Sequence, residues 1–264
     1  MILAIDIGNT NITIGGYNRN GSLILTSRIA TDPRRTADQY AVEIYDVFRL
    51  HGATVAEVQG CAISSVVPAV GTAVEQALKN LCGIQPVVIG PGVKTGLNIK
   101  IDNPAQLGAD LVAGAVGALH KYPAPCIIID MGTATTLSLI DQNGTFLGGA
   151  IAAGVGLTLE ALAQNTAQLP SVVIKAPESA VGTNTVACMQ SGLVFGTADM
   201  IDGIITRFEK QLGAPCTVVA TGGRAPQIVP HCAHKIIIDD NLLLDGLKVI
   251  FEKNAPAAQE TQRF

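Results

Sequence analysis

The feature that most constrains the fold is a repeat: ILAIDIGNTNIT, from Ile2 to Thr13, returns as CIIIDMGTATTLSL, from Cys126 to Leu139. Asp6 and Asp130 hold matching places, 124 residues apart (130 minus 6). Each copy has an apolar run, an Asp, one apolar residue, a Gly, a polar cluster with Thr, and a second apolar run that leads to an Asn-Gly pair. This order is typical of a strand, a tight turn, a returning strand and a hairpin. The repeat therefore predicts two similar domains.

Strands and helices alternate along the rest of the chain, which predicts an α/β fold with mainly parallel, covered sheets. The capping box of Thr36 and Gln39 starts a helix over Ala37–Leu50, and Val58–Val67 follows as a buried strand. Asn103 with Pro104 starts a helix of small apolar residues that runs to about His120. Small residues allow close packing of another helix, within the subunit or from a second one.

The segment Lys121-Tyr-Pro-Ala-Pro ends this helix and marks a domain boundary. We expect an N-terminal domain over 1–121, a C-terminal domain over 122–253 and a flexible polar tail over 254–264. A long helical pattern covers Val186–Leu212, but Gly192 and Gly196 argue against one unbroken helix there.

Composition narrows the possible partners. The net charge is −4 and only 14% of the residues are charged, so the broad basic surface that non-specific nucleic-acid binding needs is missing. No stretch approaches 18 consecutive apolar residues, and the chain enters a strand directly. We therefore expect a cytoplasmic protein with neither nucleic acid nor a membrane as its partner. The neutral, apolar composition favours self-association.

The six cysteines form no CxxC pair and mostly lie in apolar segments, as buried free thiols do. The segment His231-Cys232-Ala233-His234 contains two possible metal ligands, but metal spacing usually comes with further Cys or carboxylates nearby. We interpret this segment as a loop, with a metal site as the alternative.

The two repeated turns are candidate phosphate sites. An Asp-x-Gly turn between strands presents Gly N–H groups, amides and hydroxyls to phosphate oxygens, and its Asp can hold a cation directly or through water. A single copy could equally be a bulge or a plain turn, and the second copy weakens that alternative. The chain has no P-loop motif and no GxGxxG after a strand. Thr221-Gly222-Gly223-Arg224 either lets a ligand ring lie against bare backbone or simply connects a strand to a helix.

Asp110 is the only acid in the apolar helix that follows Asn103. Burying a carboxylate without a partner would cost roughly 2–7 kcal/mol. Asp110 is therefore expected to be solvated in a cleft, to be paired with another group, or to have a role in a reaction. If the helix instead begins at Leu111, Asp110 is its N-cap. In the functional interpretation, Asp110 accepts the proton of a substrate hydroxyl while that oxygen attacks a γ-phosphate.

Together these segments resemble the type III pantothenate kinases, bacterial members of the superfamily of actin and the sugar kinases. The matching segments span nearly the whole chain: DIGNTNIT at Asp6–Thr13, TGL at Thr95–Leu97, GAD at Gly108–Asp110, DMGTATT at Asp130–Thr136, GTNT at Gly182–Thr185 and TGG at Thr221–Gly223. The resemblance implies an α/β fold of two similar actin-like (ribonuclease H-like) domains, each a mixed sheet flanked by helices, with a nucleotide cleft between them.

The resemblance also implies ATP-dependent phosphorylation of the 4′-hydroxyl of pantothenate, the first step of coenzyme A biosynthesis, by a homodimer with Asp110 as general base. The residues implied to bind ATP are Asp6, Ile7, Gly8, Asn9, Thr10, Asn11, Ile12, Thr13, Thr133, Gly222 and Gly223. Those implied to bind the substrate are Ile101, Gly108, Ala109, Asp110, Leu111 and Thr185. Asp6 would hold Mg²⁺ through ATP, and Asp130 would hold a monovalent cation, K⁺ or NH₄⁺.

Two positions depart from the family pattern. The family usually has an Arg after GAD, where this chain has Leu111, and a Tyr in the pantothenate pocket, where this chain has Ile101. Losing one buried charge-assisted contact costs about 2–5 kcal/mol of binding. Two alternatives follow: a diverged paralogue that phosphorylates another small alcohol, or an ATP-binding regulatory protein without kinase activity.

Overall fold

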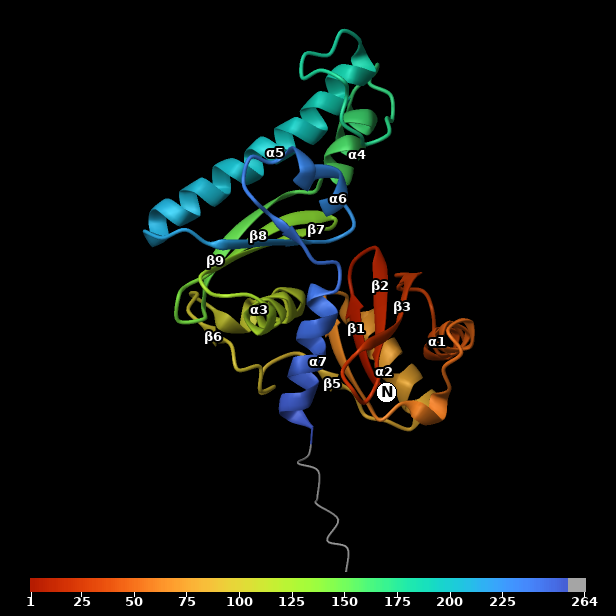
Figure 1. Ribbon diagram of the computed structural model, residues 1–264. Coiled ribbons are helices and arrows are strands. Elements are labelled where there is room, and N and C mark those ends of the chain that lie inside the picture. Colours follow the sequence, from red (N-terminus) through yellow and green to blue (C-terminus); the bar gives the residue numbers. More distant parts are fainter. Residues whose placement is uncertain (256–264) are drawn as a thin grey trace, which may run out of the picture. The chain divides into compact units, whose positions relative to one another are not determined.

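The computed structural model describes residues 1–255, in two compact units (Figure 1). Within the described residues, unit 1 comprises Met1–Gly96, Ala105–Gly117 and 243–255, and unit 2 comprises Leu97–Pro104 and Ala118–Leu242. The expected tail over 254–264 lies almost entirely outside the described residues.

Unit 1 is built on a five-stranded mixed sheet with the order β3-β2-β1-β4-β5. Its strands are β1 (Ile2–Ile7), β2 (Asn11–Tyr17), β3 (Leu23–Ala30), β4 (Gly60–Ser65) and β5 (Val87–Val88). The first three strands form an antiparallel meander, and β4 and β5 add parallel to β1. The N-terminal copy of the repeat is therefore a hairpin at the centre of this sheet.

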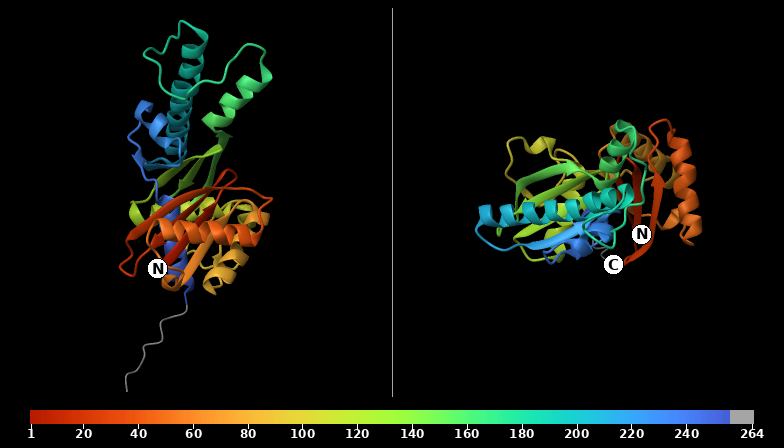
Figure 2. Two further views of the ribbon diagram at one scale, coloured as in Figure 1. Left: turned by 90° about the vertical axis from the view of Figure 1, so that its right-hand side faces the viewer. Right: turned by 90° about the horizontal axis from the view of Figure 1, so that it is seen from above.

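Helices cover both faces of this sheet. On one face, Leu3, Ile5 and Ile7 form a core with α1 (Ala37–Leu50) and α2 (Pro68–Cys82), which are seen beside the strands in Figures 1 and 2. A short 3₁₀ turn, η1 (Val55–Glu57), precedes β4. The expected capping box of α1 is confirmed: the Gln39 N–H donates to Thr36 Oγ1 at 3.3 Å and the Thr36 N–H to Gln39 Oε1 at 2.9 Å.

The other face of this sheet is covered by α7 (Leu242–Asn254). Gly60 is so close to the Phe251 ring that an added Cβ would collide with it, and one on Gly15 would lie 2.9 Å from Leu244. Tyr17 also donates to Asp245 at 2.6 Å. Because of this packing the end of the chain belongs to unit 1, which differs from the single boundary after residue 121 that the sequence suggested.

Unit 2 repeats the strand order of unit 1. Its sheet runs β11-β10-β7-β8-β9-β6, with β7, β8 and β9 as the antiparallel meander and β10 and β11 parallel to β7. The strands are β6 (Asn98–Ile99), β7 (Cys126–Met131), β8 (Ala134–Ile140), β9 (Thr145–Ala153), β10 (Thr217–Thr221) and β11 (Ile237–Ile238). Only β6, parallel to β9, has no counterpart in unit 1. The expected fold class, two similar mixed sheets flanked by helices, is confirmed.

The helices of unit 2 share its core with the sheet. They are α4 (Val155–Asn165), α5 (Thr185–Leu212), α6 (Ala225–Ile228) and the 3₁₀ turn η3 (Val229–His231). Gly192 and Gly196, which weakened the prediction of one unbroken helix, do not interrupt α5, a single helix of 28 residues. Buried side chains such as Leu193, Val194 and Ala198 hold its glycine-containing segment on the core. Within residues 1–255 no helix is both long and apolar enough to cross a membrane.

The helix that carries Asp110 begins later than the sequence suggested. Pro104–Gln106 forms only a 3₁₀ turn, η2, and α3 runs from Ala109 to Lys121. The first α-helical bond is donated by the Val112 N–H to the Gly108 carbonyl at 3.1 Å. Residues 112–118 of α3 are buried, and an added Cβ on Gly246 of α7 would collide with the Ala113 carbonyl. The small residues of α3 thus permit close packing within the chain itself.

Candidate active site

The repeat extends to individual hydrogen bonds. In the β2–β3 hairpin, the N–H groups of Asn20 and Ser22 donate to Asn18 Oδ1 at 2.9 and 3.0 Å. In the β8–β9 hairpin, those of Asn143 and Thr145 donate to Asp141 Oδ1, both at 2.9 Å. The two Asn-Gly glycines have φ of +78° and +74°, which favours glycine. The two hairpin loops therefore share the same side-chain-to-backbone hydrogen bonds and the same glycine conformation.

The first candidate phosphate turn joins β1 to β2. The Gly8 N–H donates to the Asn11 carbonyl at 3.0 Å, and the Thr31 N–H at the end of β3 donates to the Thr10 carbonyl at 3.0 Å. Thr31 Oγ1 also donates to the Gly8 carbonyl at 2.8 Å. Residues 9–11 remain exposed, so a rigid turn presents amide and hydroxyl groups to solvent.

The second turn, between β7 and β8, is one residue shorter. The Gly132 N–H donates to the Ala134 carbonyl at 3.0 Å, and the Gly154 N–H, just after β9, donates to the Thr133 carbonyl at 3.1 Å. An added Cβ on Gly154 would collide with the carbonyls of Gly132 and Thr133. Gly154 thus donates to its turn in unit 2 as Thr31 does in unit 1, but only a glycine fits at position 154.

Each repeated carboxylate lies in a row of hydroxyl residues across three neighbouring strands. Asp6 is paired in register with Thr13 on β2 and Ser64 on β4, and Asp130 is paired with Thr136 on β8 and Thr221 on β10. Paired residues project from the same face of a sheet. Of these hydroxyl residues only Thr13 was expected in the site. Ser64, Thr136 and Thr221 end strands or follow the turn, but only the strand register places them beside an Asp.

The Thr221-Gly222-Gly223 turn lies directly against Asp130. Gly222 has φ +92°, and an added Cβ would lie 2.6 Å from Asp130 Oδ1 and 2.7 Å from the Met131 backbone. The Arg224 N–H donates to the Met131 carbonyl at 3.3 Å. Unit 2 therefore brings Asp130, Thr133 and the expected Gly222-Gly223 pair to one edge of its sheet.

Asp110 is the second residue of α3 and is half-buried. Its Oδ1 accepts from the Leu111 N–H at 2.8 Å and lies over Gly108, where an added Cβ would collide with it. No hydrogen bond to Oδ2 is found within residues 1–255. The alternative in which Asp110 is the N-cap is wrong, because α3 begins at Ala109 and Asp110 is its second residue. Asp110 nevertheless accepts a hydrogen bond from the backbone of the first helical turn. Gly108, Ala109, Asp110 and Leu111 are contiguous in unit 1.

The other expected substrate residues belong to unit 2. Ile101 follows β6, and its Cγ2 lies 3.9 Å from where a Cβ on Gly148 would be. Thr185 is the exposed first residue of α5, beside the N-cap Asn184, whose side chain accepts from the Ala187 N–H at 2.9 Å. Ile101 and Leu111, the two departures from the family pattern, thus lie in different units.

Burial disfavours the thiolate form of several cysteines. Burial raises the pKa of the Cys126 thiol to about 11 and that of Cys232 to about 12, and it raises the pKa of Cys61 as well. Cys188 is exposed, unlike most of the others. Within residues 1–255 no group of three or more His, Cys, Asp or Glu side chains is arranged for a metal. His231-Cys232-Ala233-His234 is a turn end and loop, as interpreted from the sequence.

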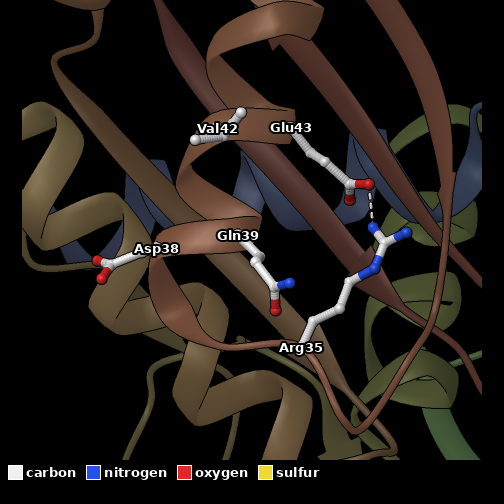
Figure 3. Close-up of a pocket in the computed structure, with 5 residues that line it drawn as sticks. All are labelled: Arg35, Asp38, Gln39, Val42 and Glu43. Atoms are coloured by element: carbon white, nitrogen blue, oxygen red, sulfur yellow. Dashed lines mark ion pairs between the residues drawn. The ribbon is translucent and has the colours of Figure 1, made fainter.

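A groove on the outer side of α1 is lined by Arg35, Asp38, Gln39, Val42 and Glu43 (Figure 3). Arg35 and Glu43 form an ion pair across it, and both side chains are about one-third exposed. No sequence motif predicts this groove. Arg35 and Glu43 neutralise each other, and the groove contains none of the repeated residues.

Comparisons with known proteins agree with the motifs. The sequence model of the family described as type III pantothenate kinase matches residues 2–207. The type III pantothenate kinase of Exiguobacterium sibiricum is 44% identical over 254 residues, which cover 96% of this chain and 100% of the relative, and that of Moorella thermoacetica is 41% identical with the same coverage. The fold resembles that of the activator of 2-hydroxyisocaproyl-CoA dehydratase from Clostridium difficile, solved with bound ADPNP (TM-score 0.55, 14% identity, 96% and 95% of the two chains).

Proposed function

The chain belongs to the type III pantothenate kinase family, and on this premise we propose how it carries out the family's reaction. It is a kinase that phosphorylates pantothenate with ATP, in the biosynthesis of coenzyme A. The acceptor is the 4′-hydroxyl group. Its oxygen forms a bond with the γ-phosphorus, the bond from that phosphorus to the bridging oxygen breaks, and ADP leaves.

Asp110 is the general base of this step. The single observation that carries the assignment is the state of its carboxylate: Oδ1 is fixed by the Leu111 N–H at 2.8 Å, and Oδ2 is left to accept the proton of the substrate hydroxyl. Gly108 supports this geometry because any side chain there would displace Oδ1. A base held by one oxygen and open at the other needs little rearrangement to act.

The repeated turns bind the nucleotide. Asp6 to Thr13 and Thr133 contact phosphates through backbone N–H and hydroxyl groups, and Gly222 with Gly223 lies against the adenosine. Asp6 holds Mg²⁺ through ATP, and Asp130 holds a monovalent cation, K⁺ or NH₄⁺. Each donor set consists of one carboxylate with neighbouring hydroxyl oxygens, which fits these ions. Mg²⁺ in particular commonly keeps several waters and binds through one or two carboxylates. Once bound, the cations offset the phosphate charge during transfer.

The residues assigned to the substrate are Gly108, Ala109 and Leu111 of unit 1, and Ile101 and Thr185 of unit 2. Leu111 and Ile101 supply no charge for the pantothenate carboxylate, so we expect weaker substrate binding than an Arg and a Tyr would give. The protein works as a homodimer, and its net charge of −4 disfavours nucleic acid as a partner.

The test is turnover by the purified protein with ATP, Mg²⁺, K⁺ and pantothenate, measured as ADP release and by mass spectrometry of the product. We expect phosphopantothenate, and Asp110→Asn should lower kcat by about 100- to 10,000-fold. Asp46→Asn, which changes an exposed acid on α1, serves as the control. Absence of turnover at millimolar pantothenate, with ATP binding intact, would contradict pantothenate as the substrate.

A second candidate function is phosphorylation of a different, less acidic alcohol. The observation that favours it is the pair of apolar residues, Ile101 and Leu111, at the substrate positions. The same assay run with a panel of neutral alcohols separates the two: the paralogue would turn over one of these faster than pantothenate, and both would depend on Asp110. A regulatory ATP-binding protein would turn over none of them.

A further inference from the structure

The Ser64 hydroxyl is a buried polar group to which the residue roles above assign no task. Ser64 is the penultimate residue of β4 and is 0% exposed. Its Oγ has no hydrogen-bond partner within the described part of the chain. Leaving such a group unsatisfied destabilises the folded protein, so the hydroxyl is best explained by a partner that it gains in another state of the protein.

The strand register identifies the neighbouring polar group. Ser64 on β4 is paired with Asp6 on β1, and paired strands lie about 4.8 Å apart. Ile5, Ile7 and Ile63 point into the core under α1 and α2, so by alternation the Asp6 and Ser64 side chains both project from the opposite face. A Ser hydroxyl can rotate, and a carboxylate has room for several donors.

The adjacent serine, which is half-buried, has hydrogen-bond partners at the same end of the strand. Ser65 Oγ donates to the Val67 carbonyl at 3.0 Å and accepts from the Val67 N–H at 3.2 Å. Only the hydroxyl on the Asp6 face lacks a partner.

Unit 2 also has an unsatisfied hydroxyl beside its repeated carboxylate, but on the antiparallel strand β8. Thr136 is paired with Asp130, and its Oγ1 is buried without a hydrogen-bond partner within residues 1–255. In both units an unsatisfied hydroxyl therefore lies across one strand pair from the repeated carboxylate. The two hydroxyls are on different neighbouring strands, since Thr221 on β10 holds the position in unit 2 that Ser64 holds in unit 1.

We propose that Ser64 is a positioning residue for magnesium–nucleotide binding: its hydroxyl donates to the Asp6 carboxylate when the nucleotide complex binds. This inference rests on the proposed function, in which Asp6 holds Mg²⁺ through ATP. With one carboxylate oxygen held by Ser64, the other points at a metal-bound water in a single orientation. The residue fixes a ligand and does not touch the reacting atoms.

The test compares Ser64→Ala with Ser65→Ala, a matched change on the opposite face. Binding of ADPNP is measured by calorimetry with Mg²⁺ and with EDTA, and Mn²⁺ is used as a paramagnetic probe of the metal site. For Ser64→Ala we expect about 5- to 20-fold weaker binding with metal, unchanged binding in EDTA and a broadened Mn²⁺ spectrum. Ser65→Ala should leave the ratio of the two affinities unchanged.

Thermal unfolding separates this role from a structural one. Removing an unsatisfied hydroxyl should leave the Tm of the free Ser64→Ala protein equal to or above that of wild type, while the Tm rise on adding Mg²⁺ with ADPNP becomes smaller. A merely structural role would lower the Tm of the free protein and leave the Tm rise on adding Mg²⁺ with ADPNP unchanged. Ser64→Thr, which places in β4 the residue that Thr221 provides in β10, should restore metal-dependent binding.

The proposal would be overturned if Ser64→Ala bound ADPNP in Mg²⁺ with wild-type affinity, or if its affinity for ADPNP fell equally in Mg²⁺ and in EDTA. These binding measurements do not require pantothenate turnover. If the wild-type protein phosphorylates pantothenate but Ser64→Ala binds metal–nucleotide normally, only the role of Ser64 fails. If the wild type shows no turnover, the assigned reaction fails and the role of Ser64 is still decided by binding.

Discussion

An added Cβ on Gly108 would collide with Oδ1 of Asp110, so this glycine lets the carboxylate turn back over the start of α3. The sequence identified Asp110 because a lone acid on an apolar helix needs a reason to be there. It could not give the direction of the carboxylate, because that depends on where α3 begins. Ser64 was not identified at all, since a serine at a strand end is ordinary until the register places it beside Asp6.

Leu111 and Ile101 give a prediction about substrate binding. Leu111→Arg combined with Ile101→Tyr should lower the KM for pantothenate by about 10-fold or more, because one charge-assisted contact is worth about 2–5 kcal/mol in a buried site. The KM for ATP should not change. Steady-state kinetics with each substrate varied in turn would measure both. An unchanged or raised KM for pantothenate would indicate that these positions serve another acceptor.

Gly222 gives a prediction about the nucleotide edge of unit 2. Gly222→Ala should lower kcat/KM for ATP by at least about 10-fold, since a Cβ 2.6 Å from Asp130 Oδ1 must displace that carboxylate. Gly92→Ala is the matched control, because Gly92 has the same φ of +92° with no atom within 4 Å of an added Cβ. It should cost only the backbone strain, about 1–2 kcal/mol of stability. Equal kinetic losses in the two variants would refute the steric explanation.

At the scale of secondary structure, the sequence predicted the elements that local patterns define. The repeated hairpins, the capping box of α1 and the strand at β4 all follow from apolar periodicity and turn residues. The predicted start of α3 was wrong, and α5 is continuous despite the glycines that weakened this prediction. Both depend on tertiary packing: α3 closes against Gly246 of α7, and Leu193 and Val194 hold α5 on the core despite its glycines.

Asp202 on α5 gives a prediction about pH. It accepts from the N–H groups of Ala233 and His234 at 2.6 and 3.0 Å and pairs with His234 Nδ1 at 2.6 Å. Burial alone would raise the pKa of Asp202, but these hydrogen bonds outweigh it and lower the pKa below its ordinary 3.8. Because the folded pKa is depressed, the stabilisation is complete above pH 3.8 and is lost as the pH falls through the folded pKa.

Asp202→Asn should therefore reduce the free energy of unfolding by about 1–3 kcal/mol at pH 7, with a smaller difference from wild type at pH 3. Urea unfolding monitored by circular dichroism at both pH values would measure this. Asp199→Asn, an exposed acid on the same helix, should have little effect at either pH. A difference between Asp202→Asn and wild type that is as large at pH 3 as at pH 7 would contradict the hydrogen-bonded carboxylate as its source.

At the scale of the whole molecule, the repeat predicted two similar domains but not how the chain is shared between them. The last helix, α7, belongs to unit 1 from Leu243, and Leu97–Pro104 belongs to unit 2. These exchanges depend on contacts between residues far apart in sequence, such as Phe251 against Gly60, and local patterns carry no signal for them. The domain boundary was the least predictable part of the fold for this reason.

The proposed homodimer gives the prediction that belongs to this scale. The sequence suggested that the small-residue helix contributes to the interface, yet residues 112–118 of α3 are buried by the chain itself. Large exposed apolar side chains occur instead around the start of α5: Val173 is 73% exposed, Val181 78% and Val186 43%. Gln190 and Ser191 hold this loop on α5 through the carbonyls of residues 173 and 180. Exposed apolar side chains on a segment held by such hydrogen bonds suit contact with a second subunit.

Light scattering after gel filtration should therefore give about twice the chain mass of 27.2 kDa for the wild-type protein. Val173→Asp combined with Val181→Asp should shift the protein toward the monomer, because two charges would be buried in the interface. Val42→Asp, at a 60% exposed valine on α1, introduces the same change in unit 1 and should leave the mass unchanged. A dimer that survives the double substitution would place the interface elsewhere on the chain, and a monomeric wild type would refute the homodimer itself.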